Sequence, residues 1–224
     1  MKITKRQKTW GSLDTEKTYA LSEAIDILRG YCSSKFDESL EIAVRLGIDV
    51  SKADQNIRGM LSLPNGTGKK VRVAVFTENG QDEAKKAGAE IVGGEELIEK
   101  VAGGFIEFDR VIATPDIMPK MSKVARVLGP KGLMPNPKLG TVTNNVVDAV
   151  KTAKAGQIEY RAEKKGIVHA GIGKMSFSTD KLAENIKALI EQLKKVKPSS
   201  SKGQYILGCS VATTQGPGLK VDVN

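Results

Sequence analysis

The sequence of 224 residues is short of the residues on which many site chemistries depend. It contains one histidine, His169, and two cysteines, Cys32 and Cys209, which lie far apart and form no CxxC motif. The cysteines therefore indicate neither a disulfide framework nor a thiolate metal site, and a multi-histidine metal site is excluded. We expect no metal or other cofactor, and a reducing, cytoplasmic setting.

Long apolar runs are missing as well. No segment approaches the roughly 18–20 consecutive apolar residues that a membrane-spanning helix needs. The basic segment 1–10 is followed by no apolar region of the kind found in a secretion signal. We therefore expect a protein that is neither secreted nor bound to a membrane.

The charge is strongly one-sided. Thirty-five Lys and Arg outnumber 26 Asp and Glu, so the net charge is +9, and residues 160–224 alone carry +6. Such an excess favours a polyanionic partner. Aromatic residues make up only 4% of the chain, which disfavours a platform that stacks on single strands. Together these features favour a folded nucleic acid.

The two ends of the chain have the pattern of an antiparallel sheet with helices. Residues 40–48 and 57–63 alternate apolar and polar side chains, which predicts half-buried strands. Residues 21–29 have helical spacing, with Ser22 as a possible cap. The later elements are expected to be a hairpin over 157–162 and 167–172, a helix from residue 179 to just before Pro198, and a strand over 205–213.

The middle of the chain follows a different pattern. Compact apolar strands over 71–76 and 111–113 alternate with short helices over 81–87 and 95–101. This alternation predicts a parallel βαβ sheet covered on both faces, a small Rossmann-like unit.

Neither end block has enough strands to bury a core alone. We therefore predict an α/β protein of two domains: a discontinuous α+β sandwich, an antiparallel sheet with helices formed by residues 1–67 plus 160–224, and an inserted Rossmann-like βαβ domain over 68–159. The two chain crossings near Gly68 and Glu159 are expected to act as a hinge. Three loosely joined units are the alternative.

Catalytic motifs are incomplete. Residues 66–69, GTGK, lack the first glycine and the final Ser or Thr of a phosphate-binding loop, and residues 171–176 lack the last glycine of a dinucleotide fingerprint. His169 is either a half-buried structural residue or a donor to phosphate or ribose. The alternative function is a small phosphate-ligand-binding enzyme that uses the Rossmann-like domain.

The loop over 129–140 contains three prolines and three glycines, and it carries the basic residues Lys131 and Lys138. It is either a solvated connector or a rigid binding element, and its charge favours the second. Three further segments, 35–39, 169–174 and 213–217, lie at strand ends, so that one sheet can gather them at one rim. Their polar groups suit phosphates and 2′-hydroxyls. Phe36 either stacks on a base or anchors the core.

These residues support a specific resemblance. Residues 121–137, MSKVARVLGPKGLMPNP, resemble the signature of the bacterial large-subunit ribosomal protein L1 family. The likeness continues through nearly the whole chain, in residues 35–39, 54–59, 89–96, 169–170 and 213–216. In this family Met is usual at the position of Gln215, and Thr is common at the position of Ser39. Gln215 therefore replaces an apolar contact with an amide, whereas Ser39 keeps the hydroxyl.

The resemblance implies a non-catalytic protein, a monomer when free, that binds large-subunit rRNA at the movable stalk beside the tRNA exit site. It also implies help in releasing deacylated tRNA, and repression of its own operon mRNA. The implied rRNA contacts are Lys35, Phe36, Ser39, Glu41, His169, Lys174, Thr213, Thr214, Gln215 and Gly216. Secondary contacts to rRNA or tRNA are implied for Lys131, Asn136 and Lys138.

Overall fold

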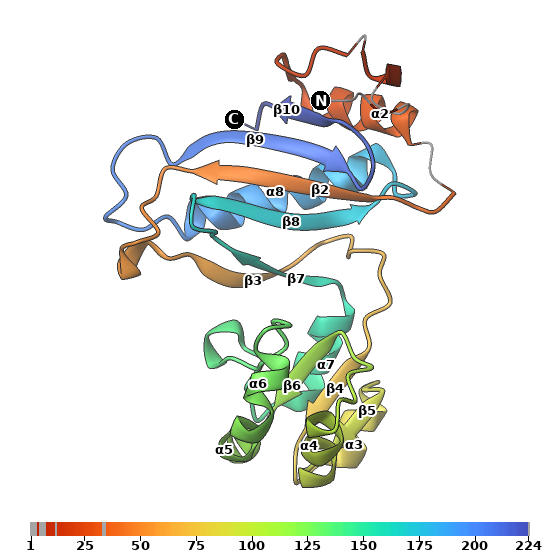
Figure 1. Cartoon of the computed structure of the whole chain (residues 1–224), viewed down its shortest axis with the longest axis vertical. Helices are drawn as coiled ribbons and strands as arrows, with labels where there is room; N and C mark the ends of the chain where they lie inside the picture. Colours follow the sequence, from red (N-terminus) through yellow and green to blue (C-terminus); the bar gives the residue numbers. More distant parts are fainter. Residues whose placement is uncertain (1–3, 5–7, 12, 33–34, 224) are drawn as a thin grey trace. The chain divides into compact units, whose positions relative to one another are not determined.

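The computed structural model describes residues 4, 8–11, 13–32 and 35–223. Contacts divide the chain into two compact units, which we call the composite unit, Met1–Thr67 with Tyr160–Asn224, and the inserted unit, Gly68–Glu159 (Figure 1). Both combine helices and sheet, which confirms the predicted α/β class. In the described part of the chain, no helix has the length and apolarity to cross a membrane.

A five-stranded sheet forms the centre of the composite unit, in the order β1-β10-β9-β2-β8. Its neighbours are antiparallel, except that β1 runs parallel to β10. The strands are β1 (Thr18–Tyr19), β2 (Ser39–Leu46), β8 (Ile167–Lys174), β9 (Ile206–Thr213) and β10 (Gly218–Val221).

The alternation along β2 produces the two faces of this sheet. Leu40, Ile42 and Val44 are buried, whereas Glu41 and Arg45 point to the other face and are exposed. The strand predicted over 40–48 is confirmed, although it begins at Ser39 and ends at Leu46. One face therefore belongs to the core, and the other carries polar side chains.

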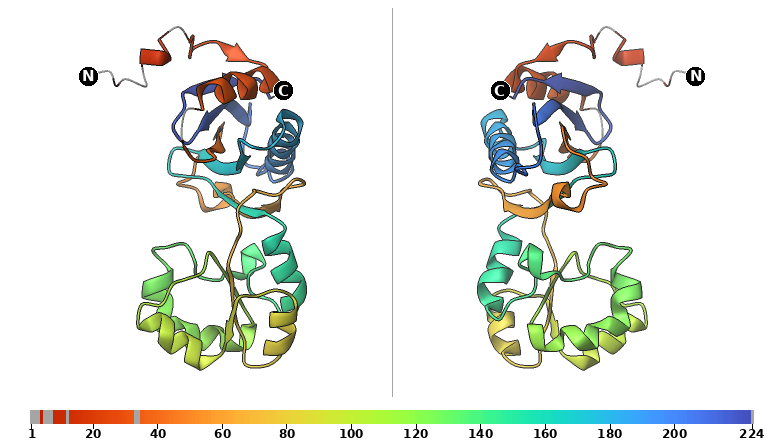
Figure 2. Two further views of the ribbon diagram at one scale, coloured as in Figure 1. Left: turned by 90° about the vertical axis from the view of Figure 1, so that its right-hand side faces the viewer. Right: turned by 90° about the vertical axis from the view of Figure 1, so that its left-hand side faces the viewer.

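Two helices cover the buried face, α2 (Leu21–Tyr31) and α8 (Thr179–Lys195) (Figure 2). Leu182, Ile186 and Leu189 recur at helical spacing along α8 and are fully buried. Both helices were predicted, but α2 begins after Ala20, so Ser22 is not its cap. The side chain of Ser178, at the N-cap of α8, makes no cap bond.

A separate two-stranded sheet pairs β3 (Arg58–Ser62) with β7 (Gln157–Arg161). The hairpin predicted for residues 157–172 is therefore wrong in extent, because β7 takes β3 as its partner. Its link to β8 is the bridge between Ala162 and Val168. Gly59 permits this pairing, since a Cβ there would lie 2.4 Å from Tyr160 Oη.

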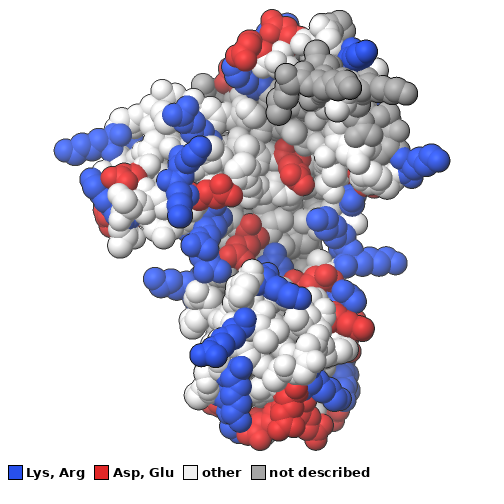
Figure 3. All heavy atoms as spheres, viewed as in Figure 1, with Lys and Arg blue, Asp and Glu red and all other residues white. Residues whose placement is uncertain are grey.

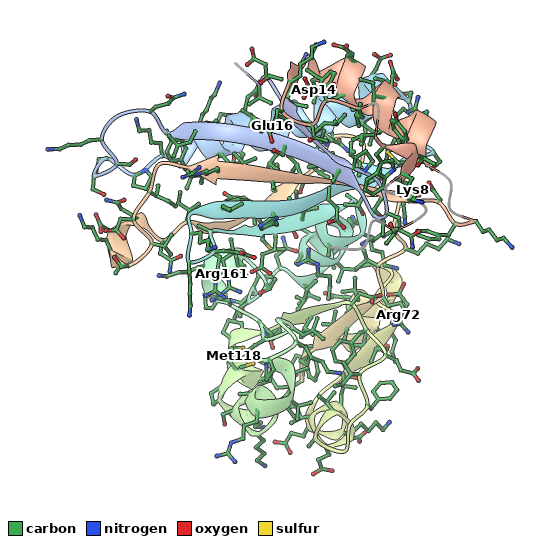
Figure 4. All side chains as sticks on the ribbon, turned by 45° about the horizontal axis from the view of Figure 1, so that its top comes forward. Lys8, Asp14, Glu16, Arg72, Met118 and Arg161 are labelled. Atoms are coloured by element: carbon green, nitrogen blue, oxygen red, sulfur yellow. The ribbon has the colours of Figure 1, made fainter. Side chains whose placement is uncertain are left out.

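The short strands β1 and β10 extend the sheet at one edge. Glu16 forms an ion pair with Lys220 on β10, and the Lys17 ammonium lies 4.9 Å from the centre of the Tyr19 ring. Asp14 accepts hydrogen bonds from the backbone N–H groups of Glu16 and Lys17, which fixes the chain before β1 (Figure 4). The sequence pattern had indicated neither strand.

The inserted unit contains a three-stranded parallel sheet in the order β5-β4-β6. Helices cover both faces, as predicted, because side chains of β4 alternate between two apolar clusters: Ala74 and Phe76 in one, Val73 and Val75 in the other. The strands are β4 (Val73–Phe76), β5 (Ile91–Gly93) and β6 (Arg110–Ala113). The helices are α3 (Gln81–Lys86), α4 (Glu95–Ala102), α5 (Met118–Met121), α6 (Ala125–Leu128) and α7 (Val146–Lys154).

Short 3-10 turns connect several of these elements. They are η1 (Ala53–Gln55), η2 (Pro115–Ile117), η3 (Ser122–Val124) and η4 (Pro137–Leu139). The Asn145 side chain caps α7 by accepting a hydrogen bond from Asp148 N at 3.3 Å.

Candidate nucleic-acid interface

One end of the five-stranded sheet brings three segments of the chain together. β2 begins there, while β8 and β9 end there, so Ser39 lies opposite Lys174 and Leu40 opposite Thr213. The turn 213–216 follows β9 at the same end. We name the residues gathered here the strand-end cluster: Lys35, Phe36, Ser39, Lys174, Thr214 and Gln215.

Lys174, at the end of β8, joins that strand to the segment 35–39. Its Nζ donates to the backbone oxygen of Asp37 at 2.9 Å and to Ser39 Oγ at 3.0 Å. An ammonium has three N–H donors, so the described residues leave one of them for a ligand. The two bonds fix the position of the cation before any ligand arrives.

Thr214 joins the turn to the start of β2. Its backbone N–H donates to Ser39 O at 3.1 Å, and its Oγ1 accepts from Ser39 N at 3.0 Å. The Thr214 hydroxyl therefore has a structural task, and Ser39 Oγ already accepts a bond from Lys174. The arrangement presents both side chains in one conformation.

Two acidic residues connect the segments by hydrogen bonds, and neither was among the expected contacts. Asp37 accepts hydrogen bonds from Ser176 N at 3.1 Å and from Ser176 Oγ at 2.7 Å. Glu38 is only 2% exposed and accepts from Gln215 N at 3.0 Å. The alternation along β2 indicated that Glu38 is buried, since residue 38 has the same parity as the buried Leu40 and Ile42.

Lys35 and Phe36 lie on the outside of the cluster. Phe36 is 51% exposed, so its role as a core anchor is excluded, and its ring is available for stacking. Lys35 is exposed, and the described residues offer it no hydrogen bond or ion pair. A free ammonium and an exposed ring thus lie next to each other in the sequence.

Thr213 and Gly216 form the tightest contact of the turn. Thr213 is 4% exposed, and its Oγ1 finds no hydrogen-bond partner of good geometry among the described residues. Its polar neighbour is the Cys32 thiol, whose pKa is raised by burial and by the charge of Glu38. A Cβ on Gly216 would lie 2.2 Å from Thr213 Oγ1, so the turn requires glycine here. The Thr213 side chain does not reach the surface.

Glu41 and His169 lie away from the strand ends. Glu41 pairs with Gly171, and His169 pairs with Ala43, on the exposed face of the sheet. His169 is exposed, which excludes the half-buried structural role, and its Nε2 lies 3.8 Å from Glu163 Oε2. A hollow of about 530 Å³ lies farther along this face, where Arg45 and Lys220 contribute to its lining.

In the inserted unit, the loop over 129–140 uses its own backbone groups. Seven of its nine N–H groups donate to protein oxygens, including Gly132 N to Gly129 O and Leu133 N to Leu128 O. A phosphate cradle needs such groups free and convergent, so this loop is unsuited to be one. The sequence-based alternative of a phosphate-binding enzyme loses its main support.

The three secondary candidates of this loop differ in availability. Lys131 and Lys138 are exposed, and neither has an ion-pair or hydrogen-bond partner for its ammonium in the described chain. The Asn136 side chain accepts from Lys138 N at 2.9 Å and caps η4. Lys131 and Lys138 can therefore meet an anion, whereas Asn136 shapes the loop.

The surface of the inserted unit is divided by charge. Asp and Glu side chains gather at one end of this unit (Figure 3). Lys120, on α5, pairs with both Glu78 and Glu95. These pairs raise the pKa of Lys120, which keeps its charge. Lys120 is thus engaged locally, in contrast to Lys131 and Lys138.

Within residues 4, 8–11, 13–32 and 35–223, no group of three or more His, Cys, Asp or Glu side chains could hold a metal ion. Burial raises the pKa of Cys209 to about 12, so this thiol stays protonated.

A two-unit α/β fold, an excess of cations and a preformed polar cluster at strand ends fit a protein that binds a polyanion. The family model for the "Ribosomal protein L1p/L10e family" matches residues 28–217. The chain belongs to this family, whose members are structural, non-enzymatic proteins of the large ribosomal subunit. The resemblance drawn from residues 121–137 is thereby confirmed.

Proposed function

We propose that this chain binds folded large-subunit rRNA through the strand-end cluster. The observation that carries the proposal is the convergence of three segments at one end of the sheet, where Lys174 is held between Asp37 O and Ser39 Oγ. Lys35 and the remaining N–H of Lys174 suit phosphates, and Phe36 suits the face of an unstacked base. Ser39, Thr214 and Gln215 offer polar atoms to ribose 2′-hydroxyls.

Family membership supports this choice of partner, because rRNA is the scaffold of the large subunit. The net charge of +9 supports it as well, since counterion release from a polyanion favours binding. The RNA element we propose is the movable stalk beside the tRNA exit site. Glu41 and His169 would then contact RNA that extends from the strand ends onto the exposed face of the sheet.

Replacing Lys35 with alanine is expected to weaken binding of a stalk rRNA fragment about threefold, because one phosphate contact is lost. The slope of log affinity against log salt should decrease by roughly 0.7–0.9. Filter binding from low to moderate salt measures both quantities. Lys195→Ala, the same change in the last turn of α8, should alter neither. Affinity that does not depend on salt, or that is equal for an unrelated hairpin, would contradict the proposal.

We further propose that the inserted unit assists release of deacylated tRNA through Lys131 and Lys138. The double variant Lys131→Ala/Lys138→Ala should slow tRNA release about fivefold on large subunits reconstituted with it, since two unpaired cations are lost. Release of fluorescent tRNA measures this rate. Lys85→Ala/Lys86→Ala on α3 provides the matched control. Equal rates for the two double variants would remove Lys131 and Lys138 from this role.

The same RNA surface suggests repression of the protein's own operon mRNA. A leader that imitates the rRNA site would occupy the strand-end cluster, so leader and rRNA fragment should compete for one site. Competition in filter binding tests this: simultaneous binding of both RNAs would show two sites and contradict the proposal.

A further inference from the structure

Glu38 is a buried acid in a place where a negative charge is unfavourable. It lies beneath a cluster whose cations suit phosphates, and its negative charge would repel the phosphates of RNA. A carboxylate that is 2% exposed also loses its hydration, a cost that only hydrogen bonds or ion pairs can offset. Glu38 takes no part in the RNA contacts proposed above, and therefore its position needs another explanation.

The hydrogen bonds of Glu38 connect its own segment, 35–39, to the chain just after β8 and to the turn after β9. Its backbone oxygen accepts from Met175 N at 2.8 Å, just beyond β8, and its Oε2 accepts from Gln215 N at 3.0 Å, in the turn after β9. The neighbouring turn residues are held differently, because Thr214 N donates to Ser39 O and Gly216 N to Thr213 O. The Gln215 backbone is thus attached to a side chain that comes from another part of the sequence.

We propose that Glu38 is a positioning residue for RNA recognition: its buried carboxylate holds the 213–216 turn in the conformation that binds RNA. This inference rests on the proposed function. Gln215 is exposed, and its main chain is fixed from the interior by the hydrogen bond to Glu38 Oε2. A turn that is already ordered loses less conformational entropy when a ligand binds. The reach of the Glu38 side chain matters here, and its charge does not.

Three substitutions separate reach from charge. Glu38→Ala removes the acceptor, Glu38→Asp keeps the charge but shortens the side chain by one methylene, and Glu38→Gln keeps the length and one acceptor oxygen. We expect Glu38→Ala and Glu38→Asp to weaken binding of the stalk rRNA fragment about tenfold, which corresponds to about 1.4 kcal/mol. Glu38→Gln should stay within about threefold of the parent protein.

Gln55 provides a matched control at the other end of β2. It is 6% exposed, and its Oε1 accepts from Asp49 N at 2.8 Å, so it too holds a loop N–H from a buried side chain. Gln55→Ala should reduce stability without changing RNA affinity. A general loss of packing would weaken RNA binding in both variants, whereas a positioning role confines the effect to residue 38.

Amide hydrogen exchange reports on the turn without RNA. In Glu38→Ala, exchange at Gln215 and Gly216 should accelerate at least tenfold, and in Gln55→Ala it should not change. Unchanged exchange at these amides overturns the inference, even if Glu38→Ala folds poorly, because Glu38→Asp supplies the same measurement. Parent-like affinity of both Glu38→Ala and Glu38→Asp for the rRNA fragment overturns it too and leaves the proposed function standing. Absence of fragment binding by the parent protein overturns both.

Discussion

Gly216→Ala is expected to weaken binding of the stalk rRNA fragment about 100-fold, a change of about 2.7 kcal/mol. The new Cβ would lie 2.2 Å from Thr213 Oγ1, a separation that atoms cannot adopt. Thr213 is 4% exposed and β-branched, so its side chain has little freedom to rotate away. The 213–216 turn must move instead, and with it the Gln215 and Thr214 groups that we assign to RNA.

Gly218 offers a control of identical chemistry two residues along the chain. A Cβ there would have no heavy atom within 4 Å, so Gly218→Ala should bind the fragment like the parent protein. Filter binding at fixed salt compares the two variants, and thermal unfolding shows whether each remains folded. Equal affinities for Gly216→Ala and Gly218→Ala would contradict the proposed importance of the turn.

A second substitution tests the cause of the effect. In the double variant Thr213→Ala/Gly216→Ala, the atom that clashes is gone, and the remaining Thr213 Cβ would be 3.4 Å from the new methyl group. Affinity should therefore recover most of the loss. Thr213→Ala alone should bind nearly as well as the parent, because this side chain is buried and does not reach the surface. A strong loss in Thr213→Ala would show that the hydroxyl itself acts on RNA.

The strands and helices with a long regular pattern could be predicted from the sequence. In β2 every second side chain is apolar, and this pattern fixes both the strand and the face that packs on α8. The apolar residues of α8 recur at helical spacing over 17 residues. Such patterns are informative because burial of one face requires apolar residues at many positions with the same spacing.

The elements that were missed are short or depend on partners distant in sequence. β1 has two residues, and β10 has four that follow Pro217; each forms by pairing with another strand and has little pattern of its own. β7 has the alternation expected of a hairpin strand, but sequence alone does not say that β3 is its partner. The helix α7 was also missed, although its cap signature, Asn145 followed three residues later by Asp148, is present in the sequence.

The site was predictable in its segments and less so in its contacts. The strand ends carry polar residues, which indicated where residues 35–39 and 213–217 would meet. The hydrogen bonds made by Asp37 and Glu38 depend on side-chain direction across three strands, which no local pattern contains. Whether the named side chains touch RNA stays a prediction.

Asn185→Asp is expected to lower the free energy of unfolding of the composite unit by about 3–4 kcal/mol at neutral pH. Asn185 is 0% exposed in α8, and its Nδ2 donates to Gly66 O at 3.0 Å and to Ile172 O at 2.9 Å. Its Oδ1 accepts from Asn65 N at 3.1 Å. The substitution keeps this acceptor but places a carboxylate oxygen against two carbonyl oxygens, with no proton between them.

The loss should depend on pH in a defined direction. Burial and the two carbonyls raise the pKa of the introduced carboxyl above the unfolded value of about 4. Between these two pKa values the folded state binds more protons than the unfolded state, so stability falls as pH rises. The destabilisation should therefore be small near pH 4, where the protonated carboxyl can donate to one carbonyl, and largest at neutral pH.

Urea unfolding followed by the fluorescence of Trp10 measures this effect, because Trp10 is the single tryptophan and belongs to the composite unit. Asn56→Asp is the control, since Asn56 is exposed in the same unit and the same change of atom should cost little there. A loss below about 1 kcal/mol for Asn185→Asp at neutral pH, or one that does not shrink in acid, would show that the three bonds of Asn185 do not hold the segment before Gly68 in place.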